Sequence, residues 1–283
     1  MERLNRFAWL IALAPGLWAQ PGLPDLTYDR DAPVHLRQTV IKSFEHETLL
    51  DVSFDSPRGG RVNAYVVLSG RLAPPGGIVW QHWGDGDRSS MLPEALAMAQ
   101  RGAVSILIDA PTDRPQAQTE GLAMWLQDVV DLRRAVDVLV RDYRVPVEHL
   151  GYVGHSYGAT MGGLIAAGER RFRALVLMGG FASLSDSVVH PQSGPAGSEE
   201  AANDLAAIDA DRYISEAAPA ALFFQFARFD RYVSPEQAER FVKAASSPKL
   251  VRWYDCGHEF NDPESATDRE NWLAQELGMN RAR

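Results

Sequence analysis

The sequence predicts an α/β fold, in which helices cover both faces of a mostly parallel, doubly wound sheet of about eight strands. From residue 77 onward, short apolar runs alternate with helix-like patterns. Continuous apolar runs are typical of strands that are buried on both faces. Three β-like stretches precede this region, which indicates an antiparallel start to the sheet. Strand–helix alternation favours right-handed crossovers within one sheet, so a single domain is predicted.

Composition narrows the class of protein. The chain has 283 residues, of which 46% are hydrophobic and 23% charged, and this balance is typical of a globular protein. Its single cysteine excludes an intrachain disulfide and cysteine-rich metal sites. A net charge of −9 disfavours a nucleic-acid partner. No H-E-x-x-H pattern and no phosphate- or dinucleotide-binding glycine motif after a strand occurs, so we expect neither a metal nor a cofactor.

Residues 1–19 are predicted to be a signal peptide. Arg3 and Arg6 give a positive start, Phe7 to Trp18 form an apolar stretch, and a possible cleavage site ends at Ala19. The stretch is shorter than the roughly 20 residues that a membrane span needs. We therefore expect a protein exported to the periplasm or beyond, with no integral membrane span in the mature chain. The alternative is an uncleaved anchor or a disordered leader.

The strands are expected in the following order. Residues 20–47 should hold an irregular lead-in and a first β segment at about 36–44. The single α/β domain, 48–283, should then open with β-like stretches at about 48–54 and 61–69. The buried strands that follow are expected at 78–80, 103–108, 152–153, 174–178, 220–226 and 250–254.

Two helices have clear signals. Between Leu122 and Leu139 the apolar residues recur in steps of three and four, which makes one stripe. The polar residues that fall away from this stripe are Asp128, Asp131, Arg134 and Arg141. Ser234 followed by Pro235 predicts the start of another helix, because serine caps helices and proline suits their first turn.

Residues 181–216 form a longer excursion between two predicted strands and include the small-residue stretch 193–198. Long segments of this kind are either mobile surface loops or lids over a site. Both interpretations stay open, as a loop or a cap-like insertion.

Gly154-His155-Ser156-Tyr157-Gly158 matches the pattern G-x-S-x-G, which is weak by itself. Its context is more specific, because a short strand precedes it and a small-residue helix at 159–167 follows it. In this strand–turn–helix setting a serine hydroxyl is exposed on a strained turn. Glycines two positions away on each side avoid clashes across so tight a turn. Ser156 is therefore predicted to be a nucleophile.

A serine needs a base to take its proton and an acid to orient that base. In this topology the acid and then the histidine follow the serine along the chain. Asp230 lies just past the run that ends at Phe226, and His258 lies just past the run that ends at Tyr254. Both are thus expected at the sheet edge that carries Ser156, where open α/β sheets place their sites. The competing acids are Asp209, Asp255 and Asp262.

Over roughly residues 48–278 the chain resembles the α/β-hydrolase superfamily, most of all its dienelactone-hydrolase-like and prolyl-oligopeptidase-like serine hydrolases. The similar motifs are Asp128-Val129-Val130-Asp131-Leu132-Arg133-Arg134-Ala135-Val136-Asp137 and Gly257-His258-Glu259-Phe260. True dienelactone hydrolases use a cysteine where this chain has Ser156. The oligopeptidases usually carry a propeller domain for which this chain has no room. The resemblance implies an α/β-hydrolase fold and a serine hydrolase.

An oxyanion hole needs two donors. One should be the amide of Tyr157, the residue after the nucleophile. The loop 81–84 resembles the His-Gly-aromatic-Gly loop of related esterases, with His82 where glycine is usual, and this resemblance implies that the Trp83 amide is the second donor. Alternatively, Trp83 is simply a packed aromatic residue. His82 and His155 are candidates for the substrate pocket.

These expectations favour hydrolysis of a small-molecule carboxylic ester through an acyl-enzyme, with Ser156, Asp230 and His258 as the catalytic residues. A thioesterase, a lactonase or a small peptidase would use the same residues. A non-catalytic exported binding protein is the alternative outside enzymes, because a fold does not dictate function.

Overall fold

The computed structural model describes residues 23–70, 76–114, 117, 121–189 and 198–279. The predicted signal peptide, 1–19, lies outside the described residues. Among the described residues, no helix combines the length and the apolar character that crossing a membrane requires.

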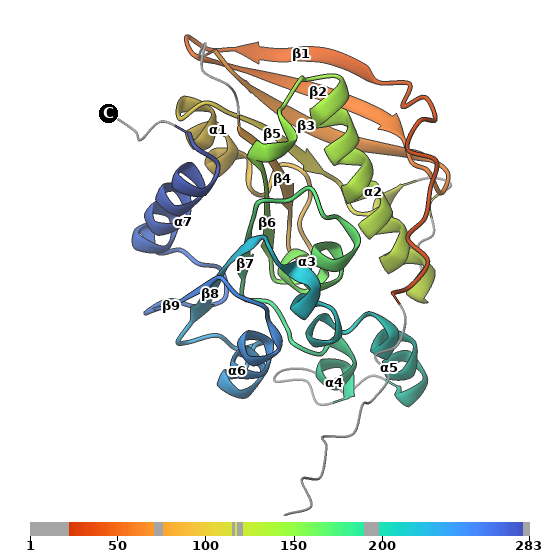
Figure 1. The fold of residues 1–283 in the computed structure, drawn as a ribbon, viewed down its shortest axis with the longest axis vertical. Helices are drawn as coiled ribbons and strands as arrows, with labels where there is room; N and C mark the ends of the chain where they lie inside the picture. Colours follow the sequence, from red (N-terminus) through yellow and green to blue (C-terminus); the bar gives the residue numbers. More distant parts are fainter. Residues whose placement is uncertain (1–22, 71–75, 115–116, 118–120, 190–197, 280–283) are drawn as a thin grey trace, which may run out of the picture.

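The described residues form a single sheet of nine strands, in the order β1-β2-β3-β5-β4-β6-β7-β8-β9 (Figure 1). The pairs from β1 to β3, and β3 with β5, are antiparallel, and every other pair is parallel. This confirms the predicted α/β class with its antiparallel start. The strands are β1 Arg37–Ser43, β2 Glu47–Asp55, β3 Arg61–Ser69, β4 Gly76–Gln81, β5 Ala103–Ile108, β6 Leu150–His155, β7 Ala174–Met178, β8 Ala221–Ala227 and β9 Lys249–Tyr254.

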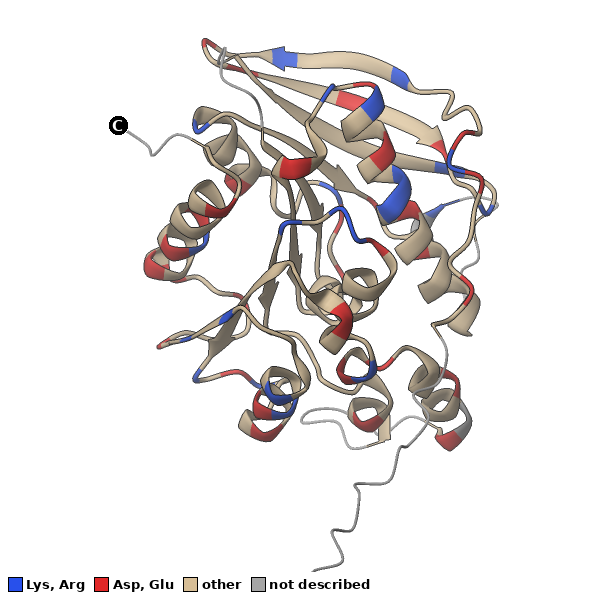
Figure 2. Cartoon of the chain, viewed as in Figure 1, with Lys and Arg blue, Asp and Glu red and all other residues tan. Residues whose placement is uncertain are grey.

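Helices cover both faces of this sheet, and each face has its own apolar core. Helices α1 and α7 pack on one face, and α2 and α3 on the other (Figure 1). Charged residues gather on helices and loops around the nearly uncharged central strands (Figure 2). The helices are α1 Leu92–Gln100, α2 Gly121–Arg141, α3 Tyr157–Gly168, α4 Leu184–Val189, α5 Glu199–Leu205, α6 Pro235–Ala244 and α7 Pro263–Glu276.

Short 3-10 turns complete the chain. They are η1 Pro111–Asp113, η2 Val147–His149, η3 Ala206–Ile208, η4 Ala210–Arg212 and η5 Ile214–Ala217. The predicted cap at Ser234 is present, since its hydroxyl accepts a hydrogen bond from the amide of Gln237 at 3.3 Å.

Helix α2 has the predicted apolar stripe, but three of the four polar residues that fall away from it are buried. Asp128 and Asp131 are fully buried, and Arg134 is 2% exposed. The lead-in segment 23–35 causes part of this burial, because Arg134 donates hydrogen bonds to the backbone carbonyls of Arg30 and Ala32 in that segment. Arg141, at the end of the helix, is exposed.

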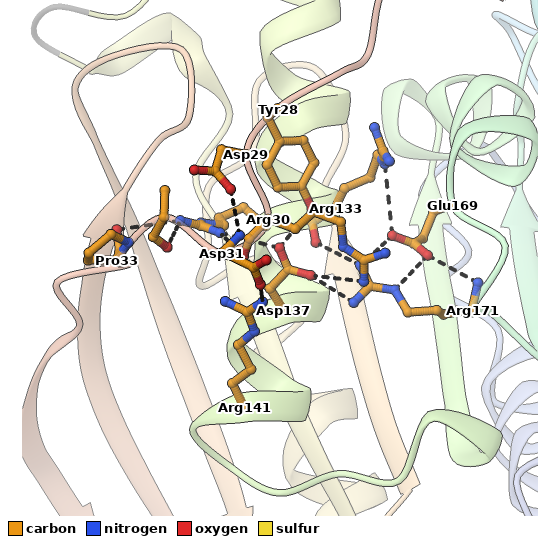
Figure 3. A network of polar contacts seen from close by, with 12 residues as sticks. Tyr28, Asp29, Arg30, Asp31, Pro33, Arg133, Asp137, Arg141, Glu169 and Arg171 are labelled. Carbon is orange, nitrogen blue, oxygen red and sulfur yellow. Dashed lines mark hydrogen bonds and ion pairs between the residues drawn. The ribbon is translucent and has the colours of Figure 1, made fainter.

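Asp137 is the centre of the network that fixes the lead-in to α2 (Figure 3). Its carboxylate, 1% exposed, accepts hydrogen bonds from the Tyr28 hydroxyl at 2.8 Å and from Arg171 at 2.7 Å. Arg30 and Arg134 lie 3.5 and 3.4 Å from the same carboxylate. Residues far apart in the chain thus share one buried carboxylate, and the lead-in covers the helix as part of the folded domain.

The described parts of segment 181–216 are mostly short helices, and hydrogen bonds join the residues between them. Asp209 accepts hydrogen bonds from the hydroxyls of Ser183 and Ser185 at 3.1 and 2.6 Å. The amide of Asp211 also bonds to the carbonyl of Ala182. Residues 190–197, which include most of the small-residue stretch, lie outside the described residues, and a lid role for the segment stays a prediction.

Candidate active site

The turn between β6 and α3 holds Ser156 in a rare backbone conformation. Its φ is 54° and its ψ is −106°, a strained region for a residue with a side chain. A Cβ atom on Gly154 would lie 2.7 Å from the amide nitrogen of Ala159, and one on Gly158 would lie 2.9 Å from the carbonyl carbon of Gln81. The two motif glycines therefore permit a turn that side chains would prevent.

The structure brings Ser156, His258 and Asp230 into one hydrogen-bonded chain. The Nε2 atom of His258 lies 2.8 Å from the Oγ atom of Ser156, and its Nδ1 atom lies 2.7 Å from the Oδ2 atom of Asp230. The side chains of His258 and Asp230 are 9% and 3% exposed. The three side chains thus have the contacts that a nucleophile, a base and an orienting acid would need for acyl transfer.

The loop after β8 fixes Asp230 from its other side. Its Oδ1 atom accepts hydrogen bonds from the amides of Tyr232 and Val233 at 2.8 and 3.0 Å, which leaves Oδ2 to the histidine. The competing acids lie elsewhere. Asp255 pairs with Arg228 on the surface, Asp262 caps α7, and Asp209 bonds to Ser183 and Ser185.

Two neighbours confine the His258 ring. Gly179 has a φ of +56°, and a Cβ atom there would lie 3.3 Å from the ring. The ring of Tyr232 packs against it edge-on, with 4.8 Å between the centroids. The backbone and one aromatic side chain therefore restrict the positions that the imidazole can take.

His155 is the last residue of β6 and lines the same site. It is 4% exposed, and its Nε2 atom lies 2.7 Å from the carbonyl oxygen of His258. Burial lowers the pKa of the imidazole to about 4, and the nearby His258 acts in the same direction. His155 is therefore neutral near pH 7.

The structure gives His82 a different place from the predicted one. Its ring is buried, with Nδ1 2.5 Å from the carbonyl of Trp83, and Nε2 accepts a hydrogen bond from the amide of Ala110 at 3.3 Å. Both ring nitrogens therefore bond to the backbone, and the side chain holds the loop after β4. The carbonyl of His82 also accepts a hydrogen bond from the amide of Gly158. This bond joins the loop after β4 to the turn at residues 154–158, which is called the nucleophile turn below after the predicted role of Ser156.

Of the two predicted oxyanion residues, Tyr157 directly follows Ser156, and Trp83 contacts His155, the residue before Ser156. Tyr157 is the first residue of α3, and amides in the first turn of a helix have no acceptor within it. Trp83 follows β4, and its ring packs edge-on against His155 with 5.3 Å between the centroids. The donor roles of the Tyr157 and Trp83 amides stay predictions.

A cavity of about 410 Å³ opens beside His258. Charged or amide side chains and aromatic rings make up its wall. The lining residues are Trp83, Asp85, His155, Arg231, Tyr232, His258, Glu259 and Asn261. The sequence analysis did not predict five of these as lining residues: Asp85, Arg231, Tyr232, Glu259 and Asn261. The last four lie within three positions of Asp230 or His258 in the sequence, and this closeness is a signal that could have identified them.

A buried polar cluster lies behind the nucleophile turn. The Tyr157 hydroxyl donates a hydrogen bond to the Oδ2 atom of Asp128 at 2.7 Å, and Arg114 pairs with Asp131 at 2.7 Å. Burial raises the pKa of Asp128 to about 7, although the hydrogen bond from Tyr157 and the charge of Arg114 oppose this shift. Within the described residues, no cluster of three or more histidine, cysteine or acidic side chains could hold a metal ion.

The chain matches no protein-family model and no curated protein sequence. Solved structures do match it. An acetyl xylan esterase from Paenibacillus sp. R4 superposes with a TM-score of 0.75 at 20% identity, over 86% of this chain and 89% of that one. An alpha/beta hydrolase from Penicillium sp. sh18 superposes with a TM-score of 0.66 at 13% identity, over 81% and 99%.

The chain has the α/β-hydrolase fold. A prolyl endopeptidase also matches, with a TM-score of 0.66 at 20% identity, over 86% of this chain but only 40% of that one. The fold predicted from the resemblance is therefore confirmed. More than half of the endopeptidase chain has no counterpart here.

Proposed function

We propose that the protein is a serine esterase that cleaves a carboxylic ester through an acyl-enzyme. Ser156 attacks the ester carbonyl while Nε2 of His258 removes its proton and then donates it to the leaving alcohol. Asp230 orients the imidazole and stabilises its cationic form. The amides of Tyr157 and Trp83 hold the oxyanion, and a water activated by His258 releases the acid.

The observation that carries this proposal is the unbroken set of contacts from Ser156 Oγ through His258 to Asp230, at 2.8 and 2.7 Å. The strained φ of Ser156 supports it, because such strain persists at sites where a side chain must be presented. A binding protein on this scaffold would need neither feature. Neighbours that are esterases favour an ester over other acyl bonds.

The wall of the cavity supports a short acyl group and a polar alcohol. Asp85, Glu259 and Asn261 offer hydrogen-bonding groups, while Trp83 and Tyr232 offer flat aromatic surface. No aliphatic side chain is among the described residues that line it. The apolar surface that a long acyl chain could bury against is therefore limited to the aromatic rings, and apolar burial supplies about 25 cal/mol per Å². The acetyl xylan esterases among the neighbours act on a substrate of this kind by name.

An ester panel of increasing acyl and alcohol size, run on the parent protein and on Ser156→Ala, tests the function. The parent should hydrolyse short-chain esters, and the variant should lose about a millionfold in kcat. Equal rates for the two proteins would refute the proposal. Thioester, lactone and peptide substrates belong in the same panel, and turnover of one of them far above that of esters would reassign the bond that is cleaved.

A further inference from the structure

We propose that His155 is a positioning residue for the base: its side chain fixes the backbone of His258 to the strand that carries the nucleophile. The inference rests on the proposed function and adds a role for a residue that neither attacks nor transfers a proton. It also explains why a histidine occupies the position directly before Ser156.

The direction of the contact follows from its chemistry. The carbonyl oxygen of His258 can only accept, so the Nε2 atom of His155, 2.7 Å away, must carry the proton and donate it. His155 is almost fully buried, which disfavours its charged form. A neutral donor can hold the carbonyl without placing a second positive charge beside the imidazole that becomes cationic during the reaction.

The ring of His155 packs against aromatic rings of two loops at the site. It packs edge-on against Trp83, of the loop after β4, with 5.3 Å between centroids, and edge-on against Phe260 at 5.5 Å. Its centroid lies 5.2 Å from that of His258. One side chain therefore spans from the nucleophile strand to the loop that carries the base and to the loop that carries the second proposed oxyanion donor.

The base loop needs such an anchor. His258 follows β9 in a tight turn, in which the amide of Phe260 bonds to the carbonyl of Gly257 and Phe260 itself has a φ of 50°. Among the described strands, β9 is at the end of the sheet and pairs with β8 alone. Misplacement of a reacting group by about 1 Å can cost on the order of a hundredfold in rate. A hydrogen bond to the residue beside Ser156 limits that movement.

Two variants of nearly equal shape separate the hydrogen bond from packing. His155→Gln places an amide N–H close to the position of Nε2, whereas His155→Met has a similar length and no donor. For a short-chain ester we expect His155→Met to lower kcat by about 10- to 100-fold with KM within about threefold. His155→Gln should restore most of this loss, to within about threefold of the parent kcat. The rate at which a fluorophosphonate labels Ser156 should change in parallel.

Thermal unfolding of all proteins controls for damage to the fold, and His155→Phe, which keeps a ring without the N–H donor, replaces His155→Met if the latter does not fold. Equal kcat in the glutamine and methionine variants would overturn the positioning role, as would a change confined to KM. Ser156→Ala keeps the two proposals apart. If it remains active, the proposed function fails, whereas loss of activity there with a fully active His155→Met removes only the inference about His155.

Discussion

The nucleophile turn depends on two glycines whose neighbours are backbone atoms, which cannot move aside as a flexible side chain can. A methyl group on Gly158 would overlap the carbonyl of Gln81, which belongs to the strand next to β6 in the sheet. The shape of the turn, and with it the direction of the Ser156 hydroxyl, is therefore set by the absence of side chains at the flanking positions.

Gly158→Ala should lower the free energy of unfolding by about 1–3 kcal/mol, the usual cost of overpacking, and should abolish most ester hydrolysis because the turn must shift. Thermal unfolding and kcat measure the two effects. Gly84→Ala is the matched control for stability, because a Cβ atom there would meet nothing within 4 Å. Equal melting temperatures for the two variants would show that the clash is relieved without cost.

Asp128 is a second residue whose environment has a measurable consequence. Its pKa in the folded state, about 7, lies above the value of 3.8 for an unperturbed carboxyl group. Between about pH 4 and pH 7 the folded protein therefore keeps a proton that the unfolded chain has released. The protonated carboxyl group therefore adds to the free energy of unfolding. This contribution is complete below pH 4 and is lost as the pH rises through 7. The lowered pKa of His155 acts in the opposite sense between about 4 and 6.5.

Asp128→Asn removes this titration while keeping an acceptor for the Tyr157 hydroxyl. As the pH rises from 4 to 7, the melting temperature of the variant should increase relative to that of the parent by several degrees. Taking the difference cancels the contribution of His155, which both proteins share. A difference that does not vary over this range would contradict the raised pKa.

At the scale of single residues, the sequence predicts those site residues whose location follows from their position at the end of a strand. Ser156, Asp230 and His258 each follow a strand of the sheet, and parallel strands bring their carboxyl ends to one edge. The bond from His155 to the carbonyl of His258 joins residues 103 positions apart. No local pattern encodes such a contact, and the same holds for the ring of His82, which turns to the backbone.

At the scale of elements, predictions succeed where apolar periodicity dominates. Strands such as β7 and β8 are continuous apolar runs, and α2 has its stripe. The short helices α4 and α5 offer no such pattern. The polar side of α2 would be expected to face solvent from its pattern alone. It is partly buried because a lead-in about a hundred residues earlier in the chain covers it.

The network at Asp137 makes the contribution of that lead-in testable. Asp137→Ala should lower the free energy of unfolding by about 3–5 kcal/mol, because it leaves the guanidinium groups of Arg134 and Arg171 without their shared buried partner. Urea unfolding measures the loss. The control is Asp31→Ala, whose carboxylate is 96% exposed beside Arg141, and it should change stability by no more than about 1 kcal/mol. Similar losses in both variants would contradict a buried, cooperative network.

At the scale of the whole molecule, the carboxyl edge of the sheet brings Ser156, Asp230 and His258 together, and the loops after β4, β8 and β9 line the cavity beside His258. The charged, amide and aromatic side chains of that cavity's wall predict the order of substrates. For p-nitrophenyl esters, kcat/KM should be highest for acetate and should fall by about tenfold or more by octanoate, since the described lining offers no aliphatic surface to the chain. A kcat/KM that rises steadily with acyl length would place an apolar acyl groove at this edge instead.

The central claim is that the hydroxyl of Ser156 is activated by His258 to form a covalent intermediate, and peptide-level mass spectrometry after treatment with a fluorophosphonate tests it most directly. The parent should carry one adduct, on the peptide that contains Ser156, and both Ser156→Ala and His258→Ala should remain essentially unlabelled while folded. An adduct on another residue, or no adduct on the folded parent protein, would contradict it.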